Sequence, residues 1–100
     1  MFARVFSADM PKERREREKI AKLLEEQVLP RVARENGFRG VTFFFDRQNG
    51  KLMSVTLYDN EAQLKQAHDD IKEFRAGILK QLGGSHLTAE SFEVVASRAP

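Results

Sequence analysis

Two side chains combine an ionisable group with a position beside a predicted apolar surface, namely His68 and Tyr58. His68 follows Leu64 by about one helical turn, and an imidazole bordering a cleft can move a proton near neutral pH. Tyr58 ends a predicted strand, where its hydroxyl could donate a hydrogen bond to a ligand carbonyl or an anionic oxygen. Each also has a plain structural interpretation, as a half-exposed helix-surface histidine and as an aromatic residue of a subunit interface. Both are candidate catalytic residues, and no Ser/His/Asp or paired-carboxylate arrangement can be assembled beside them.

Geometry or composition excludes other patterns that resemble sites. His68, Asp69 and Asp70 are consecutive, and consecutive helical residues point about 100° apart, so they cannot converge on one ion. The stretch Gly83–His86 follows a predicted helix, whereas a phosphate-binding loop precedes one. The chain has no cysteine, which excludes disulfides, thiolate chemistry and Cys-ligated metals. We therefore expect neither a metal nor a cofactor.

The charge pattern favours neither nucleic acid nor a membrane as a partner. Seventeen basic and fifteen acidic residues give a formal net charge of +2, and the charged run Lys12–Lys19 mixes both signs. The stretch Arg39–Phe45 resembles an RNA-recognition signature, but that signature belongs on a third strand and this stretch is the predicted second. The longest apolar runs are shorter than the ~20 residues of a membrane helix, and the N-terminus does not resemble a signal peptide. We expect a cytoplasmic protein with a single domain over residues 1–100.

Hydrophobic periodicity predicts elements in the order strand, helix, strand, strand, helix, strand. The predicted strands cover residues 1–7, 41–46, 52–58 and 89–96, and the predicted helices cover about 11–35 and 60–82. With right-handed crossovers, this order closes as a four-stranded antiparallel sheet with both helices on one face. The predicted fold class is therefore α+β, of the ferredoxin-like βαββαβ type.

Both predicted helices carry an apolar stripe. The stripe of the first helix is Ile20, Leu24, Val28 and Val32, and that of the second is Leu64, Ala67, Ile71, Phe74, Ile78 and Leu82. Pro30 lacks an amide hydrogen and predicts a kink within residues 26–30. Asn60 and Gln63 resemble a capping box at the start of the second helix, and Gly83 is suited to end it.

The loop between the second and third strands fixes which side chains share a face. A three-residue loop over residues 48–50 would pair Phe45 with Met53 and place the apolar residues of both strands on the same side. A two-residue Asn-Gly turn would pair Phe45 with Ser54 and put them on opposite sides. We therefore predict the three-residue loop, with Gly50 in the left-handed conformation.

This register predicts apolar side chains on both faces of the sheet. A ligand pocket is expected under the helices, lined by Phe43, Phe45, Val55, Ile71 and Phe74. The open face is expected to carry Phe2, Arg4, Phe6, Thr42, Phe44, Leu52, Ser54, Thr56, Tyr58, Glu93 and Val95. Because so many aromatic residues exceed what a soluble monomer usually exposes, we expect a homodimer through the open face. The alternative is that the C-terminal tail or a loop folds over it.

Two short stretches resemble a known family. Residues 36–40, Asn-Gly-Phe-Arg-Gly, lead into the second strand, and residues 57–62, Leu-Tyr-Asp-Asn-Glu-Ala, leave the third. Together they are similar to the Gly-Phe-x-Gly and hydrophobic-Trp-x-Ser/Asn-Glu-x pattern of the antibiotic-biosynthesis-monooxygenase-like dimeric α+β barrels. The resemblance implies two ferredoxin-like sheets packed face to face as a barrel.

The family contains cofactor-independent oxygenases acting on polycyclic aromatic or quinone substrates, haem-degrading enzymes and proteins with no assigned activity. Tyr58 stands where the family pattern has Trp. In the haem-degrading relatives a Trp and a haem-ligand His occupy places that fall near Ala67 and Gly77 here. Neither residue can do that work, so the resemblance does not extend to haem degradation.

Two functions of different class are compatible with these features. The resemblance implies a cofactor-independent monooxygenase or related enzyme for a small hydrophobic or aromatic substrate. His68 and Tyr58, selected above by residue type and position, would be its catalytic residues. An apolar cavity would bind an electron-rich substrate anion and let it react directly with oxygen. The alternative is a non-catalytic small-ligand-binding or interaction module. A cavity on the order of several hundred Å³ with His68 pointing into it would favour the enzyme.

Overall fold

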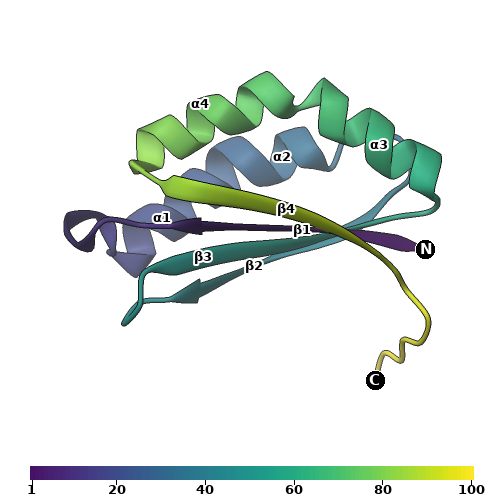
Figure 1. The fold of residues 1–100 in the computed structure, drawn as a ribbon, viewed down its shortest axis with the longest axis horizontal. Coiled ribbons are helices and arrows are strands. Elements are labelled where there is room, and N and C mark those ends of the chain that lie inside the picture. Colours follow the sequence, from purple (N-terminus) through teal and green to yellow (C-terminus); the bar gives the residue numbers. More distant parts are fainter.

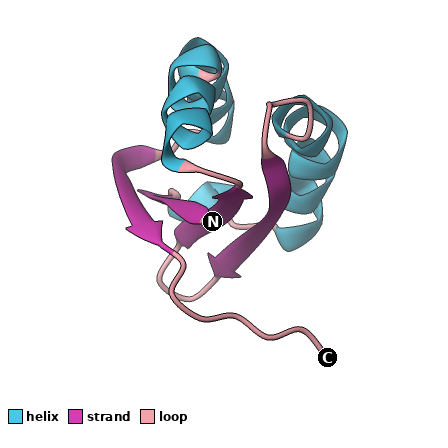
Figure 2. Cartoon of the chain, turned by 90° about the vertical axis from the view of Figure 1, so that its right-hand side faces the viewer, coloured by secondary structure: helices cyan, strands magenta, loops and turns pink.

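The computed structural model describes residues 1–100 as a four-stranded antiparallel sheet with its helices on one face (Figure 1). The strands are β1 (Phe2–Asp9), β2 (Phe38–Asp46), β3 (Lys51–Tyr58) and β4 (Ser85–Glu93), in the spatial order β2-β3-β1-β4. Viewed along the sheet, the helices form one layer and the strands the other (Figure 2). The predicted ferredoxin-like α+β fold is confirmed. None of the helices has both the length and the apolar composition that crossing a bilayer requires.

The first helical segment is interrupted where the proline predicts it. It consists of a 3₁₀ turn (Lys12–Arg14), α1 (Arg17–Leu23), a π-helical turn (Leu24–Val28) and α2 (Leu29–Val32). The π turn directly precedes Pro30, which cannot donate to the carbonyl of residue 26. The α-helix starts at Arg17, later than predicted, because residues 12–14 form a 3₁₀ turn instead. The stripe residues are all buried, namely Ile20, Leu24, Val28 and Val32.

The second helical segment has the predicted ends and one unpredicted break. The Asn60 side chain accepts a hydrogen bond from the Gln63 amide at 2.9 Å, and Gly83 ends the segment with a φ of 67°. At Ile71 the backbone leaves helical geometry (φ −106°, ψ 8°), which divides the segment into α3 (Glu61–Asp70) and α4 (Lys72–Leu82). Ile71 is buried in the core at this break.

The predicted register of the β2–β3 hairpin is wrong. Asp46 pairs with Lys51, which leaves a four-residue loop and places Phe45 opposite Leu52. The Asp46 carboxylate accepts hydrogen bonds from the backbone and side-chain amides of Asn49 at 3.1 and 2.7 Å, and its carbonyl accepts one from Gly50 at 2.7 Å. These bonds fix the loop one residue longer than expected. Gly50 is left-handed, as predicted, with a φ of 74°.

The register reverses the two sides of β3 and β1. The buried side of β3 consists of Leu52, Ser54, Thr56 and Tyr58. In β1, Phe2, Arg4 and Phe6 pair with residues of this set and share their side. The prediction that the open face carries Phe2, Arg4, Phe6, Leu52, Ser54, Thr56, Tyr58 and Glu93 is therefore wrong, since all of them lie on the helix-covered side. The prediction holds for Thr42 and Phe44.

The open face of the sheet is nevertheless apolar. Its members include Val5, Phe44, Met53, Val55, Leu57 and Phe92. Phe44 is 51% exposed and Phe92 50% exposed. The C-terminal tail leads away beneath the sheet rather than lying on it (Figures 1 and 2), and Val95 within this tail is 92% exposed. Neither the tail nor a loop covers the face.

Candidate ligand cavity

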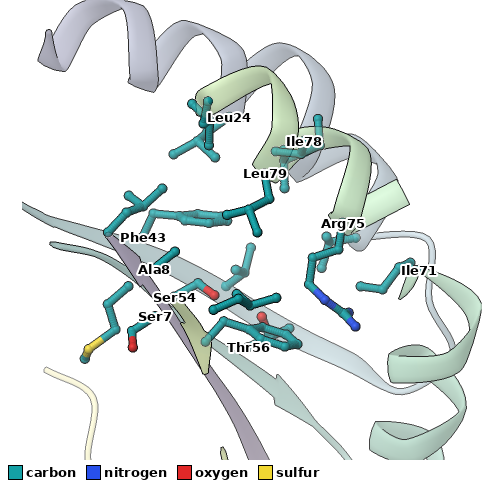
Figure 3. A pocket seen from close by; sticks show the side chains of 18 of the residues that line it. Ser7, Ala8, Leu24, Phe43, Ser54, Thr56, Ile71, Arg75, Ile78 and Leu79 are labelled. Atoms are coloured by element: carbon teal, nitrogen blue, oxygen red, sulfur yellow. The ribbon is translucent and has the colours of Figure 1, made fainter. Parts of the chain in front are cut away.

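A cavity of about 100 Å³ lies between the sheet and the helices (Figure 3). Its walls combine residues that are far apart in the sequence. The first helical segment contributes Leu24, Val28 and Val32; α4 contributes Phe74, Arg75, Ile78, Leu79 and Leu82; and the strands contribute Phe6, Ala8, Phe43, Leu52, Ser54, Thr56, Tyr58 and Leu87. The apolar stripes of both helical segments and the buried sides of the strands thus meet here, and most of the wall is hydrophobic.

Three of the five residues predicted to line a ligand pocket line this cavity, namely Phe43, Ile71 and Phe74. Phe45 is on the same side of the sheet but packs against the core and borders a separate groove beside α1. Val55 belongs to the open face, because the hairpin register pairs it with Thr42. Its placement in the pocket is therefore wrong.

Tyr58 lies in the cavity wall at the end of β3 and is only 3% exposed. It packs with Leu64 and Ala67 of α3. Burial, followed by the charge of Glu35, raises the pKa of its hydroxyl above 10.0. The hydroxyl is therefore a hydrogen-bond donor at neutral pH. Its interpretation as a residue of the open face is wrong.

His68 does not line the cavity but lies behind it. Its ring stacks on Phe6, with the ring centroids 6.1 Å apart and the planes 13° apart. Its Nδ1 atom is buried without a hydrogen-bond partner. Burial, followed by the charges of Arg75 and Arg4, lowers the pKa of the imidazole below 6.5. His68 is therefore neutral at pH 7 and reaches the cavity only through Phe6.

Two arginines that the sequence analysis did not select complete this region. The guanidinium carbon of Arg75 lies 4.4 Å from the centroid of the Phe6 ring, and that of Arg4 lies 5.8 Å from it. Arg75 lies in the cavity wall and extends from α4 toward the sheet (Figure 3). Its place in the sequence carries a signal, because it follows Ile71 by four residues and precedes Ile78 by three, which is the spacing of the buried stripe.

The two arginines have no acidic partner. The Nε atom of Arg4 and an Nη atom of Arg75 are buried without a hydrogen-bond acceptor, and neither side chain takes part in an ion pair. The Glu35 carboxylate near Tyr58 is already paired with Arg31 at 2.8 Å. Burial, followed by repulsion from Arg4, lowers the pKa of Arg75. This end of the cavity therefore has a positive potential with no fixed counter-charge.

The residues around the cavity do not form a metal-ligand set. No group of three or more His, Cys, Asp or Glu side chains comes together in residues 1–100. The polar groups that face the cavity or lie next to it are hydroxyls and guanidinium groups. They can donate hydrogen bonds to an oxyanion but are not the usual ligands of a transition metal.

The two stretches that resemble the monooxygenase-like family lie side by side. The Asp59 amide donates a hydrogen bond to the Gly37 carbonyl at 2.9 Å, and Arg39 forms an ion pair with Asp59. Gly37 has a φ of 77°, and a Cβ atom there would overlap the Gln63 side chain. The glycine is therefore favoured by its conformation, and a Cβ atom would also displace the end of the Gln63 side chain.

No protein-family model matches the sequence, and no curated protein matches it. Solved structures do match the fold over almost the whole chain. A protein from Deinococcus radiodurans assigned as an antibiotic biosynthesis monooxygenase superposes with a TM-score of 0.75 and 16% identity, covering 100% of this chain and 98% of that one. The cofactor-independent oxygenase SnoaB from Streptomyces nogalater has a TM-score of 0.71 and 13% identity, covering 96% and 94%. A dimeric ferredoxin-like protein from an uncultured marine organism has a TM-score of 0.67 and 16% identity, covering 99% and 98%.

These similarities show that the chain has the fold of the antibiotic-biosynthesis monooxygenases, as its sequence motifs predict. Because the sequence identities are only 13–16%, these structures show the fold of the chain but not its activity. One fold can host many activities, so the activity of this chain depends on the residues around its cavity.

Proposed function

We propose that this chain, with its antibiotic-biosynthesis-monooxygenase fold, binds a small hydrophobic or aromatic molecule in the cavity and oxidises it with O₂ without a bound cofactor. The observation that supports this proposal best is the apolar cavity between sheet and helices, which has a guanidinium and a phenol in its wall. A mostly apolar pocket with a few convergent polar groups is the usual form of a small-molecule site. Monooxygenases and a cofactor-independent oxygenase among the structures of the same fold support the reaction type.

The chemistry requires only a substrate that can supply its own electrons. A phenolic substrate releases its hydroxyl proton to solvent water, and the resulting anion transfers electrons to O₂ as a new bond forms between a ring carbon and oxygen. The O–O bond then breaks, and the distal oxygen takes the ring C–H proton and one proton from solvent and leaves as water. The ring remains as a quinone. One phenol and one O₂ thus give one quinone and one water. The Arg75 guanidinium and the Tyr58 hydroxyl would stabilise the negative charge on the substrate oxygen.

His68 has a different role in this proposal. It stacks behind Phe6 and does not line the cavity, so it acts as a positioning residue that holds Phe6 against the substrate. His68→Phe retains a stacking ring and should keep most of the activity, whereas His68→Ala should raise KM more than it lowers kcat. A large loss of kcat in both variants would instead indicate proton transfer by the imidazole.

The test is oxygen uptake by the purified protein with a panel of phenols, hydroquinones and naphthols, after dialysis against a metal chelator. Consumption of one O₂ per quinone formed is expected, with Tyr58→Phe reducing kcat. Substituting exposed Lys80 on α4 is a matched control that leaves activity unchanged. Uptake that disappears on dialysis and returns with a metal or flavin would contradict the proposal.

We also propose that two copies of the chain pair through the open face of the sheet. The exposed residues Phe44 and Phe92 and the half-buried residues Met53 and Val55 form an apolar surface on the open face, and such surfaces commonly mark protein interfaces. The dimeric ferredoxin-like protein of the same fold supports a second copy as the occupant. Light scattering at micromolar concentration should give twice the mass of 11.5 kDa.

A second function, ligand binding without catalysis, is favoured by two observations. The cavity of about 100 Å³ is smaller than the volume expected for the enzyme, which is on the order of several hundred Å³. His68 is shielded from the cavity by Phe6, which leaves no general base in the wall. A ligand that binds and protects the protein against unfolding, with no oxygen uptake from any member of the panel, would favour this module over the enzyme.

A further inference from the structure

We infer that the ligand of this cavity is an anion built on a single aromatic ring, with its oxyanion held by Arg75 and Arg4. The inference rests on the proposed function only in taking the cavity as the ligand site. It adds the charge and the size of the ligand, and it holds for the enzyme and for the binding module alike.

The size follows from the volume of the cavity. The space between the sheet and the helices is about 100 Å³. An engineered cavity of about 150 Å³ in another protein binds benzene, whereas drug-sized ligands occupy pockets of roughly 300 Å³ or more. A single ring is therefore the largest aromatic body that this packing admits with small side-chain adjustments. Fused-ring molecules would require α4 to move away from the sheet.

The shape of the wall favours a flat ring. Phe6, Phe43 and Phe74 bring three aromatic side chains to the cavity from β1, β2 and α4. Aromatic rings interact favourably in offset-stacked and edge-to-face arrangements, which a planar ligand can satisfy and a branched aliphatic chain cannot.

The charge follows from the two arginines. The Arg75 guanidinium is part of the cavity wall, and Arg4 lies beside the same Phe6 ring. Each has a buried nitrogen without an acceptor, and neither has a carboxylate partner. Both side chains are half-buried, and a guanidinium that is partly withdrawn from water without an acceptor is costly. A neighbouring like charge adds to that cost. An oxyanion would satisfy both guanidinium groups with charge-assisted hydrogen bonds.

Other ligand classes fit these observations less well. A neutral aromatic molecule would fill the apolar part and leave both cations unpaired. A small inorganic anion would pair with the arginines and leave the apolar part empty. Only a ligand with both parts uses the whole wall.

The test uses benzoate as the probe in oxygen-free buffer, so that binding is measured separately from turnover. Tyr58 is the only tyrosine and the chain has no tryptophan, so the fluorescence of the protein reports from the cavity wall. Benzoate should bind roughly ten- to a hundredfold more tightly than benzyl alcohol, which corresponds to a charge-assisted hydrogen bond. It should also bind more tightly than 2-naphthoate, which has a second ring, and than acetate, which has none.

Arg75→Met tests the assignment of the charge. This variant should lose the preference for benzoate while still binding benzyl alcohol, and its melting temperature should stay the same or rise because an unpaired buried charge has been removed. Lys80→Met, at an exposed position of the same helix, is the matched control and should keep the preference. Arg75→Lys and Arg4→Met provide independent tests. The first keeps both positive charges but loses the planar guanidinium, and the second keeps Arg75 in the cavity wall, so each should show an intermediate preference.

The outcomes separate the inference from the proposed reaction. Equal binding of benzoate and benzyl alcohol, an unchanged preference in Arg75→Met, or tighter binding of 2-naphthoate would overturn the inference. Anion-selective binding with no oxygen uptake would overturn the oxygenase alone. Oxygen uptake from neutral or fused-ring substrates without selectivity for anions would support the oxygenase and overturn the inference.

Discussion

At β3, the two faces of the sheet differ in the opposite way from a simple amphipathic pattern. Beneath the helices, β3 presents Ser54, Thr56 and Tyr58 and β1 presents Arg4, whereas the open side of β3 presents Met53, Val55 and Leu57. The covered sides of β3 and β1 thus contain hydroxyl groups and one charged group, whereas the open side of β3 is apolar.

The difference separates two uses of a buried surface. Polar groups placed under helices are costly unless a bonding partner reaches them, so they indicate a site for a ligand. Apolar groups left exposed in a broad patch indicate a site for another protein surface. In β3, successive residues point to opposite faces. Thr56 therefore faces the proposed ligand site, and its neighbour Val55 faces the proposed protein interface.

The largest expected effect is on the open face. Phe44→Glu places a charge on the most exposed aromatic residue of the open face, and two-fold symmetry introduces it twice. The dissociation constant of the dimer should rise roughly a thousandfold, equivalent to about 4 kcal/mol. Sedimentation equilibrium over a range of concentrations measures it.

Val95→Glu is the control for that experiment, because Val95 lies in the tail at 92% exposure. It should leave the association unchanged. A dimer of undiminished strength in Phe44→Glu would show that the open face is not the interface.

The next effect compares neighbours on opposite faces, Leu52 and Met53. Leu52 belongs to the core, so Leu52→Ala should lower the free energy of unfolding by about 3 kcal/mol at every protein concentration. Met53→Ala should cost less because Met53 is only half-buried, and its effect should grow with protein concentration because association would bury Met53 further. Urea unfolding at several protein concentrations distinguishes the two variants. If the destabilisation by Leu52→Ala and by Met53→Ala depended on protein concentration in the same way, the proposed difference between the two faces would be wrong.

A smaller effect concerns the histidine behind Phe6. The pKa of His68 is lowered from 6.5, chiefly by burial, so the unfolded chain takes up the proton more readily than the folded one. The free energy of unfolding should therefore fall as the pH drops below 6.5, and His68→Gln should reduce this slope. Urea titrations at stepped pH measure it, with the exposed His86→Gln as the control. If the unfolding free energy of His68→Gln fell with decreasing pH as steeply as that of the unchanged protein, His68 would not be the cause of this pH dependence.

The smallest effect lies at alkaline pH. The pKa of Tyr58 is raised above 10.0 by burial and by Glu35, so the folded chain keeps a proton that the unfolded chain loses. Stability should fall as the pH rises above 10.0, and Tyr58→Phe should flatten that decline. The ultraviolet absorbance of the phenolate reports the pKa directly, because Tyr58 is the only tyrosine. A bound anion near Tyr58 should raise this pKa further.

The sequence was sufficient to predict the elements and their order, but not the register of the hairpin. Periodic stripes such as the one through Leu24 and Val28 depend only on local spacing, and they are buried as predicted. The hairpin register depends on the hydrogen bonds from Asn49 to the Asp46 carboxylate, which hold a four-residue loop. The prediction instead assumed that the apolar residues of both strands lie on one face, and this assumption does not detect those bonds. The assumption fails for β3, because its more apolar side lies on the open face of the sheet.

The candidate site was predictable only in part, for a related reason. Phe43, Ile71 and Phe74 line the cavity because they belong to regular stripes. Arg75 occupies an equivalent stripe position, but its charge makes it resemble a surface residue. Arg4 could be assigned to the covered face only once the pairing of β1 with β3 was known.

The π-helical turn at Leu24–Val28 keeps the first helix in phase with the sheet. In a regular α-helix, residues spaced by four advance about 40° past a full turn at each step, so a stripe of four would wind about 120° around the axis. The wider turn takes up part of that rotation, and Leu24 and Val32 both remain on the cavity wall. Removing one residue from this turn would restore an ordinary helix and rotate everything after it by about 100°, carrying Val32 away from the sheet.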